Sequence, residues 1–290
     1  MHSLAVVCVN CFILISGYFG IRWKAKSLAS LLYQVLFWLF VGVMVANILD
    51  IKNTGSLVSI IGNYFSGRWF VPAYLGLYFL TPALNALIEK SNQKKLGRYI
   101  ILFYLYSAII GYALRSQEFN EGMSVMSLVG LYLIGAFLRK TSYTIFCYRP
   151  LVDFGIYLTL SLLLTGVNSG LLFVGISKSP LGYLNPLVIL MSIYLFLFFQ
   201  KLRIGEIKII NFVAASAFAV YLFHMHPLLY GLYQQICDKI HSAGIEAVFL
   251  LPIFFTTIFI LTIIIDRIRI ASFGIIWNMI LGNENPVGAQ

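Results

Sequence analysis

The sequence predicts an all-α integral membrane protein, a polytopic bundle of about nine transmembrane helices. Of its 290 residues, 60% are hydrophobic and 10% are charged, and the mean hydropathy is +0.90. A soluble domain carries about 25% charged residues, so this chain has too little polar surface to face water. The apolar runs are continuous and lack the two-residue alternation of a membrane β-barrel, which leaves helices as the spanning elements.

Each predicted span is an apolar run near the roughly 20 residues that cross a bilayer. In chain order the runs lie near 3–20, 28–47, 69–88, 98–115, 124–138, 152–175, 182–200, 209–233 and 245–266. Fifteen of the 20 basic residues follow the odd-numbered spans: Arg22, Lys24 and Lys26; Lys90, Lys94, Lys95 and Arg98; Arg139, Lys140 and Arg149; Lys201, Arg203 and Lys208; Arg267 and Arg269. The other connections hold Lys52, Arg68, Arg115, Lys178 and Lys239.

This asymmetry orients the chain, because cytoplasmic connections of membrane proteins carry the excess of lysine and arginine. The prediction is a multi-pass protein of the cell inner (plasma) membrane with a cytoplasmic C-terminus. The net charge of +10 then reflects topology, and no nucleic-acid partner is expected. Residues 1–269 are expected to form one membrane-embedded domain, and residues 270–290 an interfacial or cytoplasmic tail.

The same orientation places Met1 outside, directly before an apolar helix. No basic segment precedes Ser3–Phe19 and no small-residue cleavage site follows it, so it does not read as a signal peptide. The expectation from sequence is that one preceding helix is missing and that this chain alone does not catalyse.

Metal and nucleotide chemistry find no support in the sequence. Cys8 and Cys11 form a Cys-x-x-Cys pair without the second pair that a zinc site requires, and all four cysteines are expected to be ordinary small apolar residues. No P-loop, Gly-x-Gly-x-x-Gly or His-Glu-x-x-His is present, so neither a bound cofactor nor a metal is predicted.

Four stretches occur in an order that resembles the family-3 membrane acyltransferases. They are Val9-Asn-Cys-Phe-Ile-Leu-Ile-Ser-Gly-Tyr-Phe19; Arg68-Trp-Phe-Val-Pro-Ala-Tyr74 with Leu80-Thr-Pro-Ala-Leu-Asn85; Leu131-Tyr-Leu-Ile-Gly-Ala-Phe-Leu-Arg139; and Ala217-Phe-Ala-Val-Tyr-Leu-Phe-His224. The spacing is most similar to the branch that O-acetylates bacterial surface polysaccharides. The resemblance implies transfer of an acyl group, an acetyl group from acetyl-CoA in that branch, from cytosolic acyl-CoA to a sugar hydroxyl of a cell-surface polysaccharide or lipid-linked glycan.

Family members have about ten helices, and their first helix carries an arginine and a histidine regarded as essential. The resemblance implies that this chain lacks that helix, and His2 is not expected to replace the histidine. For the donor, the resemblance points to Arg22, Lys24 and Lys26, which follow Ser-Gly-Tyr although the family's Arg-x-x-Arg is not matched literally. Arginine and lysine can hold the phosphates of CoA, but the same three residues could simply anchor the topology.

For the glycan acceptor, the candidates are Arg68, Trp69 and Tyr74, with Tyr64 close by in sequence. Aromatic faces and hydrogen-bond donors suit a sugar, whereas interfacial tryptophan and tyrosine are also common as a membrane belt.

His224 is the candidate catalytic residue, because it ends the fourth stretch and histidine can act as a general base near neutral pH. On a continuous helix, His224 and His226 would be separated by about 200° and face opposite sides. Pro227 is expected to leave the Phe223 carbonyl without a helical donor, so that a side chain or water must satisfy it. A packing role remains the alternative for both histidines.

A second class of function fits a polytopic helical protein with polar residues in its spans. Such a chain could be a transporter or flippase for a glycan or a lipid intermediate, or a non-catalytic remnant. Transporters often contain repeated halves with broken helices at matching positions. Only one predicted span, 209–233, is clearly broken, and we find no such symmetry.

Overall fold

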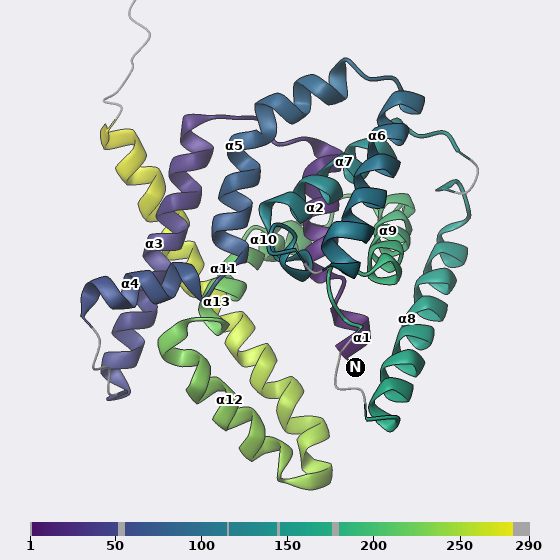
Figure 1. The fold of residues 1–290 in the computed structure, drawn as a ribbon. Helices are drawn as coiled ribbons and strands as arrows, with labels where there is room; N and C mark the ends of the chain where they lie inside the picture. Colours follow the sequence, from purple (N-terminus) through teal and green to yellow (C-terminus); the bar gives the residue numbers. More distant parts are fainter. Residues whose placement is uncertain (1, 52–55, 115, 144–145, 176–179, 281–290) are drawn as a thin grey trace, which may run out of the picture. The chain divides into compact units, whose positions relative to one another are not determined.

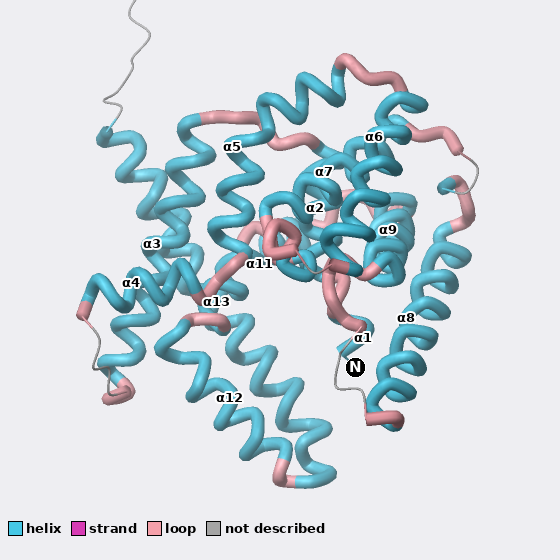
Figure 2. Tube along the Cα trace, viewed as in Figure 1, coloured by secondary structure: helices cyan, strands magenta, loops and turns pink. Residues whose placement is uncertain are grey.

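The computed structural model describes residues 2–51, 56–114, 116–143, 146–175 and 180–280. Throughout these ranges the regular secondary structure is helical, with connecting loops and no strand (Figures 1 and 2). The prediction of an all-α protein is therefore confirmed.

Four described helices are long and apolar enough to cross a membrane: α3 (Ala25–Ile48), α5 (Phe70–Glu89), α8 (Pro150–Phe173) and the stretch Gly244–Ile280, most of which is α13 (Ala247–Ile280). A bent helix pair within 208–241 raises the number to five if it counts as one span. Shorter apolar helices cover Ser3–Phe19 and Pro186–Lys201. The count of about nine spans stays a prediction.

The chain divides into two compact units. The first comprises residues 1–23 and 69–203, and the second comprises residues 24–68 and 204–290. The first unit contains α1 (His2–Ala5), α2 (Cys8–Phe19), α5, α6 (Gln93–Tyr106) with its π-helical extension (Ser107–Ala113), a 3-10 turn (Asn120–Gly122), α7 (Val125–Lys140), α8 and α9 (Pro186–Lys201).

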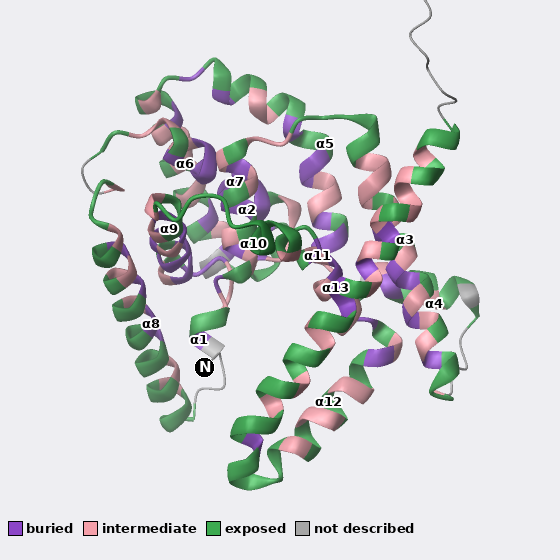
Figure 3. Cartoon of the chain, turned by 180° about the vertical axis from the view of Figure 1, so that it is seen from behind, coloured by how far each residue is buried: buried purple, intermediate pink, exposed green. Residues whose placement is uncertain are grey.

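Helix α7 forms the centre of the first unit, and nearly all of it is buried (Figure 3). It packs against α2 so closely that a Cβ atom on Gly17 would lie 2.1 Å from the Tyr132 carbonyl oxygen. Conversely, a Cβ on Gly135 would lie 2.3 Å from the Leu14 carbonyl oxygen. Small residues that bring two backbones together are typical of membrane helix pairs. Gly17 of the Ser-Gly-Tyr stretch therefore has a packing role.

Polar side chains define the ends of several helices in this unit. Asn92, Ser124 and Asn185 each accept a hydrogen bond from a backbone N–H in the first turn of α6, α7 and α9 respectively. Such N-caps satisfy donors that the helix itself leaves free. The last turn of α9 is tied to α8 by an ion pair of 2.5 Å between Lys201 Nζ and the buried carboxylate of Asp153.

The second unit contains α3, α4 (Leu57–Ser66), α10 (Lys208–Ala214), α11 (Ala217–His224), α12 (Pro227–His241), a 3-10 turn (Gly244–Glu246) and α13. A buried polar group joins α3 to α13: Trp38 Nε1 donates to Asp266 Oδ1 over 3.1 Å, and Arg269 binds both oxygens of Asp266 at 2.9 and 2.8 Å. Each member of this group has a partner, as burial demands. Helix α13 runs without a break past residue 270, where the tail was predicted to begin, and residues 281–290 lie outside the described part.

The predicted span 209–233 is not a continuous helix. Helices α10 and α11 form one arm, α12 forms the other, and the two arms are bent by 88°. Pro227 occupies the first turn of α12, where its missing N–H has no helical partner to lose. The Phe223 carbonyl accepts the N–H of His226 over 3.0 Å, so the prediction that a side chain or water must satisfy it is wrong.

Candidate active site

Arg68, His224 and His226, with Tyr64 beneath them, form a cluster inside the second unit that we call the histidine–arginine cluster. Tyr64 lies on α4, and Arg68 follows Gly67 directly after the end of that helix. The two histidines flank the break between α11 and α12. The break matters because it ends the helical geometry between positions 224 and 226. Arg68 bonds to the Met225 carbonyl between the two histidines, and the helical-wheel expectation of opposite faces does not apply because no continuous helix joins positions 224 and 226.

Arg68 is completely buried. Its Nε donates to the Met225 carbonyl over 3.1 Å, and its guanidinium carbon lies 4.1 Å from the centre of the Tyr64 ring. Burial lowers the pKa of the Arg68 guanidinium, which is still protonated at neutral pH. Its Nη1 and Nη2 atoms are buried and find no hydrogen-bond partner among the described residues. The cluster therefore holds a cation with open donor positions.

Tyr64 packs against both Arg68 and His226 and is itself fully buried. Its hydroxyl donates to the Val35 carbonyl on α3 over 3.0 Å, which fixes the ring beneath Arg68. Burial raises the pKa of Tyr64 to about 12, so the phenol stays neutral near pH 7. It acts as an aromatic surface for the cation rather than as its counter-ion.

The hydrogen bonds of His224 fix its tautomer. Its Nδ1 lies 2.7 Å from the Val220 carbonyl oxygen, and a carbonyl can only accept. Nδ1 therefore carries the proton, and Nε2 of the neutral ring keeps its lone pair. His224 is half-buried, with Tyr221 and Tyr233 rings at centroid distances of 6.1 Å. In its neutral form, the ring therefore has the tautomer that a general base needs, with Nε2 as the proton acceptor.

His226 has the opposite tautomer. Its Nδ1 accepts the N–H of Leu228 over 3.3 Å as the N-cap of α12, so the proton of the neutral ring is on Nε2. The side chain is completely buried, and Nε2 has no hydrogen-bond partner in the described part of the chain. The Leu39 carbonyl faces the ring without reaching hydrogen-bonding geometry. His226 thus presents an unused donor.

Gly42 on α3 makes room for that ring. A Cβ atom at position 42 would lie 2.2 Å from His226 Cδ2, well inside van der Waals contact. The ring of His226 is also held by Tyr64, at a centroid distance of 5.2 Å. Its position is therefore set by packing from two helices as well as by the capping bond.

The predicted donor residues do not fall in one unit. Arg22 is exposed in the first unit, and Lys24 and Lys26 are exposed in the second. Lys26 Nζ lies 5.9 Å from the Trp277 ring centre on α13. A further basic residue, Arg139, lies close to this segment: it donates to the carbonyl of Phe19 over 3.5 Å, and Phe19 precedes Arg22 by three residues. The sequence analysis assigned Arg139 only to topology.

A closed hydrogen-bond network holds the backbone just before Arg22. The Ile21 N–H donates to the Tyr132 hydroxyl at 3.0 Å, that hydroxyl donates to Asn85 Oδ1 at 2.7 Å, and Asn85 Nδ2 donates to the Ile21 carbonyl at 2.8 Å. We call this group the Ile21 clamp. The sequence reading missed its role, although Tyr132 and Asn85 both lie within stretches that carry the resemblance.

Two of the predicted glycan-binding residues, Trp69 and Tyr74, lie in the first unit, whereas Arg68 belongs to the second. The Trp69 ring lies 5.4 Å from that of Tyr183, and Tyr74 stacks on Phe70 at 5.6 Å. Tyr183 and Glu121 line a pocket of about 360 Å³ together with Ala5, Val6, Met123, Leu181 and Gly182. Trp69 therefore contacts a residue, Tyr183, that lines this pocket. The wall of the pocket has both an aromatic ring and a carboxylate.

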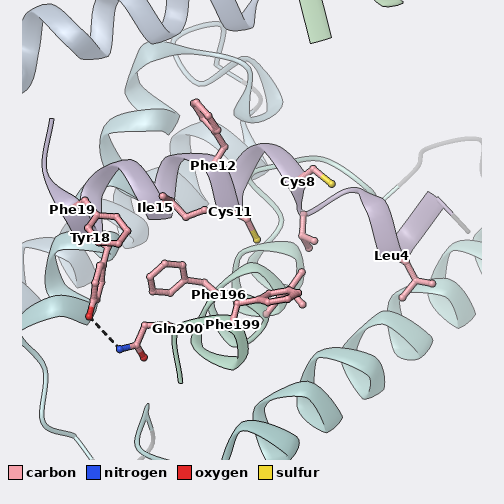
Figure 4. Close-up of a pocket in the computed structure, with 12 residues that line it drawn as sticks. Leu4, Cys8, Cys11, Phe12, Ile15, Tyr18, Phe19, Phe196, Phe199 and Gln200 are labelled. Carbon is pink, nitrogen blue, oxygen red and sulfur yellow. Dashed lines mark hydrogen bonds between the residues drawn. The ribbon is translucent and has the colours of Figure 1, made fainter. Parts of the chain in front are cut away.

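A larger pocket of about 810 Å³ lies between α2 and α9 (Figure 4). Its wall is mostly apolar and aromatic, and a hydrogen bond of 3.2 Å from Gln200 Nε2 to the Tyr18 hydroxyl is near one end. Cys8 and Cys11 are part of this wall as free thiols. No group of three or more potential metal ligands occurs in the described ranges.

These observations define a helical membrane protein with a base-competent histidine beside a buried arginine. The family model for the acyltransferase domain Acyl_transf_3 matches residues 1–267, and the chain belongs to this family of membrane acyltransferases. No curated protein and no solved structure matches the chain.

Proposed function

We propose that the protein is a membrane O-acyltransferase that moves an acyl group, most simply acetyl, from cytosolic acyl-CoA to a sugar hydroxyl. The glycan acceptor is a cell-surface polysaccharide or a lipid-linked glycan. The observation that carries the proposal, beyond family membership, is the bond from His224 Nδ1 to the Val220 carbonyl. It leaves Nε2 free to take the proton of the attacking hydroxyl.

On the donor side, Arg22, Lys24 and Lys26 hold the phosphates of CoA in this proposal, joined by Arg139. CoA is a polyanion, and charge-assisted hydrogen bonds from arginine and lysine suit phosphate oxygens. The exposure of Arg22, Lys24 and Lys26 supports a role at an aqueous mouth. The Ile21 clamp supports it further, since it fixes the backbone that carries Arg22.

On the glycan side, Trp69 and Tyr74 are proposed to bind the sugar. The pocket walled by Tyr183 and Glu121 supports this assignment, because a sugar ring stacks on aromatic faces and its hydroxyls donate to carboxylates. Arg68 is less suited to an exposed glycan, since it is completely buried. The protein is proposed to be a multi-pass protein of the inner (plasma) membrane with its C-terminus in the cytoplasm.

The test is to supply membranes that contain the protein with labelled acetyl-CoA and the glycan of the same cell. We expect label in the glycan as an ester that mild alkali removes, and none in membranes without the protein. Movement of unlabelled glycan across the membrane without any ester would contradict the proposal and indicate a transporter or flippase. Parallel measurement of both quantities separates the two outcomes.

A further inference from the structure

The fully buried polar atoms of the histidine–arginine cluster that lack a partner are all hydrogen-bond donors. They are Nη1 and Nη2 of Arg68 and Nε2 of His226, each buried and without a partner in the described residues. An arginine side chain has no acceptor atom, and the capping bond from Leu228 occupies the acceptor nitrogen of His226. Buried donors that stay unpaired are costly, so the cluster is suited to a ligand that brings an acceptor oxygen.

The ligand oxygen must also carry negative charge, or develop it. Arg68 is a buried cation, and removing a charge from water is expensive unless an opposite charge compensates it. The Tyr64 phenol beneath it is neutral, and the buried carboxylate of Asp266 is already bound by Arg269 and Trp38. The described residues therefore leave the Arg68 charge without a carboxylate partner.

We propose that Arg68 and His226 bind the carbonyl oxygen of the acyl thioester and stabilise the negative charge that develops on it during transfer. This inference rests on the proposed acyltransferase function. It gives the cluster two roles: His224 moves the proton, and Arg68 with His226 holds the oxygen. Donors placed where charge develops contribute most in a buried site, because water does not compete with them.

The step balances without any further reactant. His224 Nε2 takes the proton of the sugar hydroxyl while the hydroxyl oxygen forms a bond to the carbonyl carbon of the thioester. The electron pair of the carbonyl π bond moves to the carbonyl oxygen, where Arg68 and His226 donate to it. When the pair returns, the carbon–sulfur bond breaks, and the CoA thiolate receives the proton from His224. The products are the sugar ester and the CoA thiol.

A binding measurement tests the oxygen site without turnover. The probes are two CoA thioethers, S-carboxymethyl-CoA with a carboxylate near the position of the acyl oxygen, and S-ethyl-CoA with none. We expect the wild-type protein to bind S-carboxymethyl-CoA at least about tenfold more tightly, since a hydrogen-bonded charge pair is stronger than a neutral contact. In Arg68→Gln this preference should fall to near one.

The matched control is Arg269→Lys, which changes the other buried arginine of the unit, the one paired with Asp266. It should keep the wild-type preference between the probes. If Arg68→Gln fails to fold, Arg68→Lys and His226→Asn replace it, since asparagine also caps helices. In turnover, each should lower kcat by about a hundred- to a thousandfold and leave KM for acetyl-CoA within a few-fold of wild type.

The outcomes separate this inference from the proposed function. Equal preference for S-carboxymethyl-CoA in wild type and every Arg68 variant would overturn the oxygen site, even if acetyl transfer occurs. The same holds if His226→Asn keeps full kcat, which would make His226 a packing residue near Leu39. If neither thioether nor acetyl-CoA binds the wild-type protein, the acyl-CoA donor itself is wrong, and the oxygen site is wrong with it.

Discussion

At the scale of single residues, the two histidines differ because their hydrogen bonds differ. His224 donates from Nδ1 to a carbonyl in its own helix, whereas His226 accepts at Nδ1 from the first turn of the next one. The resemblance in sequence singled out His224 as the candidate base, and that role stays a prediction. The tautomers could not be read from sequence, because they depend on where the helix between the two residues ends.

We therefore predict different consequences for the two residues. His224→Ala should lower kcat about a hundred- to ten-thousandfold, the range of general acid–base catalysis, with the protein level unchanged. Initial rates with labelled acetyl-CoA, normalised to the amount of inserted protein, provide the measurement. Wild-type kcat in a correctly inserted His224→Ala protein would show that the base lies elsewhere.

Gly42→Ala tests the packing of the His226 ring. The added methyl group would overlap the imidazole, so we expect a loss of about 1–3 kcal/mol in unfolding free energy, as for other overpacked sites, together with reduced transfer. The control is Gly62→Ala on α4, where nothing lies within 4 Å of the new Cβ and alanine favours the helix. Urea unfolding in detergent compares the two, and equal stability of both variants would contradict the close approach of α3 to the ring.

At the scale of helices, the apolar runs predicted where helices lie but not where they break. Residues 209–233 are apolar enough for one span, yet the chain bends by 88° after His224. Pro227 correctly indicated an interruption of this span, but its effect on hydrogen bonding was predicted wrongly. The proline begins a new helix, and the N–H of His226 donates to the Phe223 carbonyl. The Ile21 clamp was also beyond the sequence, because Asn85 and Tyr132 come from two helices and meet only after packing.

The Ile21 clamp predicts a donor-binding phenotype. Tyr132→Phe removes the hydroxyl that accepts from Ile21 and donates to Asn85, so the backbone before Arg22 should loosen. We expect KM for acetyl-CoA to rise several-fold while kcat stays within about twofold, since a neutral hydrogen bond contributes about 1 kcal/mol. Tyr18→Phe, which loses only an exposed bond to Gln200, is the control. Equal KM values for acetyl-CoA in the two variants would show that the Ile21 clamp does not contribute to donor binding.

At the scale of the whole molecule, composition and charge decide more than any motif does. The apolar composition predicted a helical membrane protein, and the four ordered stretches predicted the family, both of which are confirmed. Within the described ranges, four helices, or five with the bent pair, meet the length of a span, while other predicted spans correspond to shorter helices. Sequence hydropathy counts apolar residues and does not show how far each run remains helical.

The charge asymmetry makes a testable prediction of topology. A fluorescent protein that folds only in the cytoplasm should be bright when fused to the C-terminus, and alkaline phosphatase fused there should be inactive. Fusions in the loop around Glu118 should give the reverse result. Active phosphatase at the C-terminus would invert the orientation and place Arg22, Lys24 and Lys26 away from cytosolic acyl-CoA.

The central claim is that an acyl group passes from acyl-CoA on one side of the membrane to a glycan hydroxyl on the other. Inverted vesicles that contain the protein test it directly, with the glycan sealed inside and labelled acetyl-CoA added only outside, at the exposed cytoplasmic face. We predict alkali-labile label on the enclosed glycan, and none in vesicles with His224→Ala. Unlabelled glycan in wild-type vesicles that bind and retain acetyl-CoA, or equal label with His224→Ala, would contradict the account.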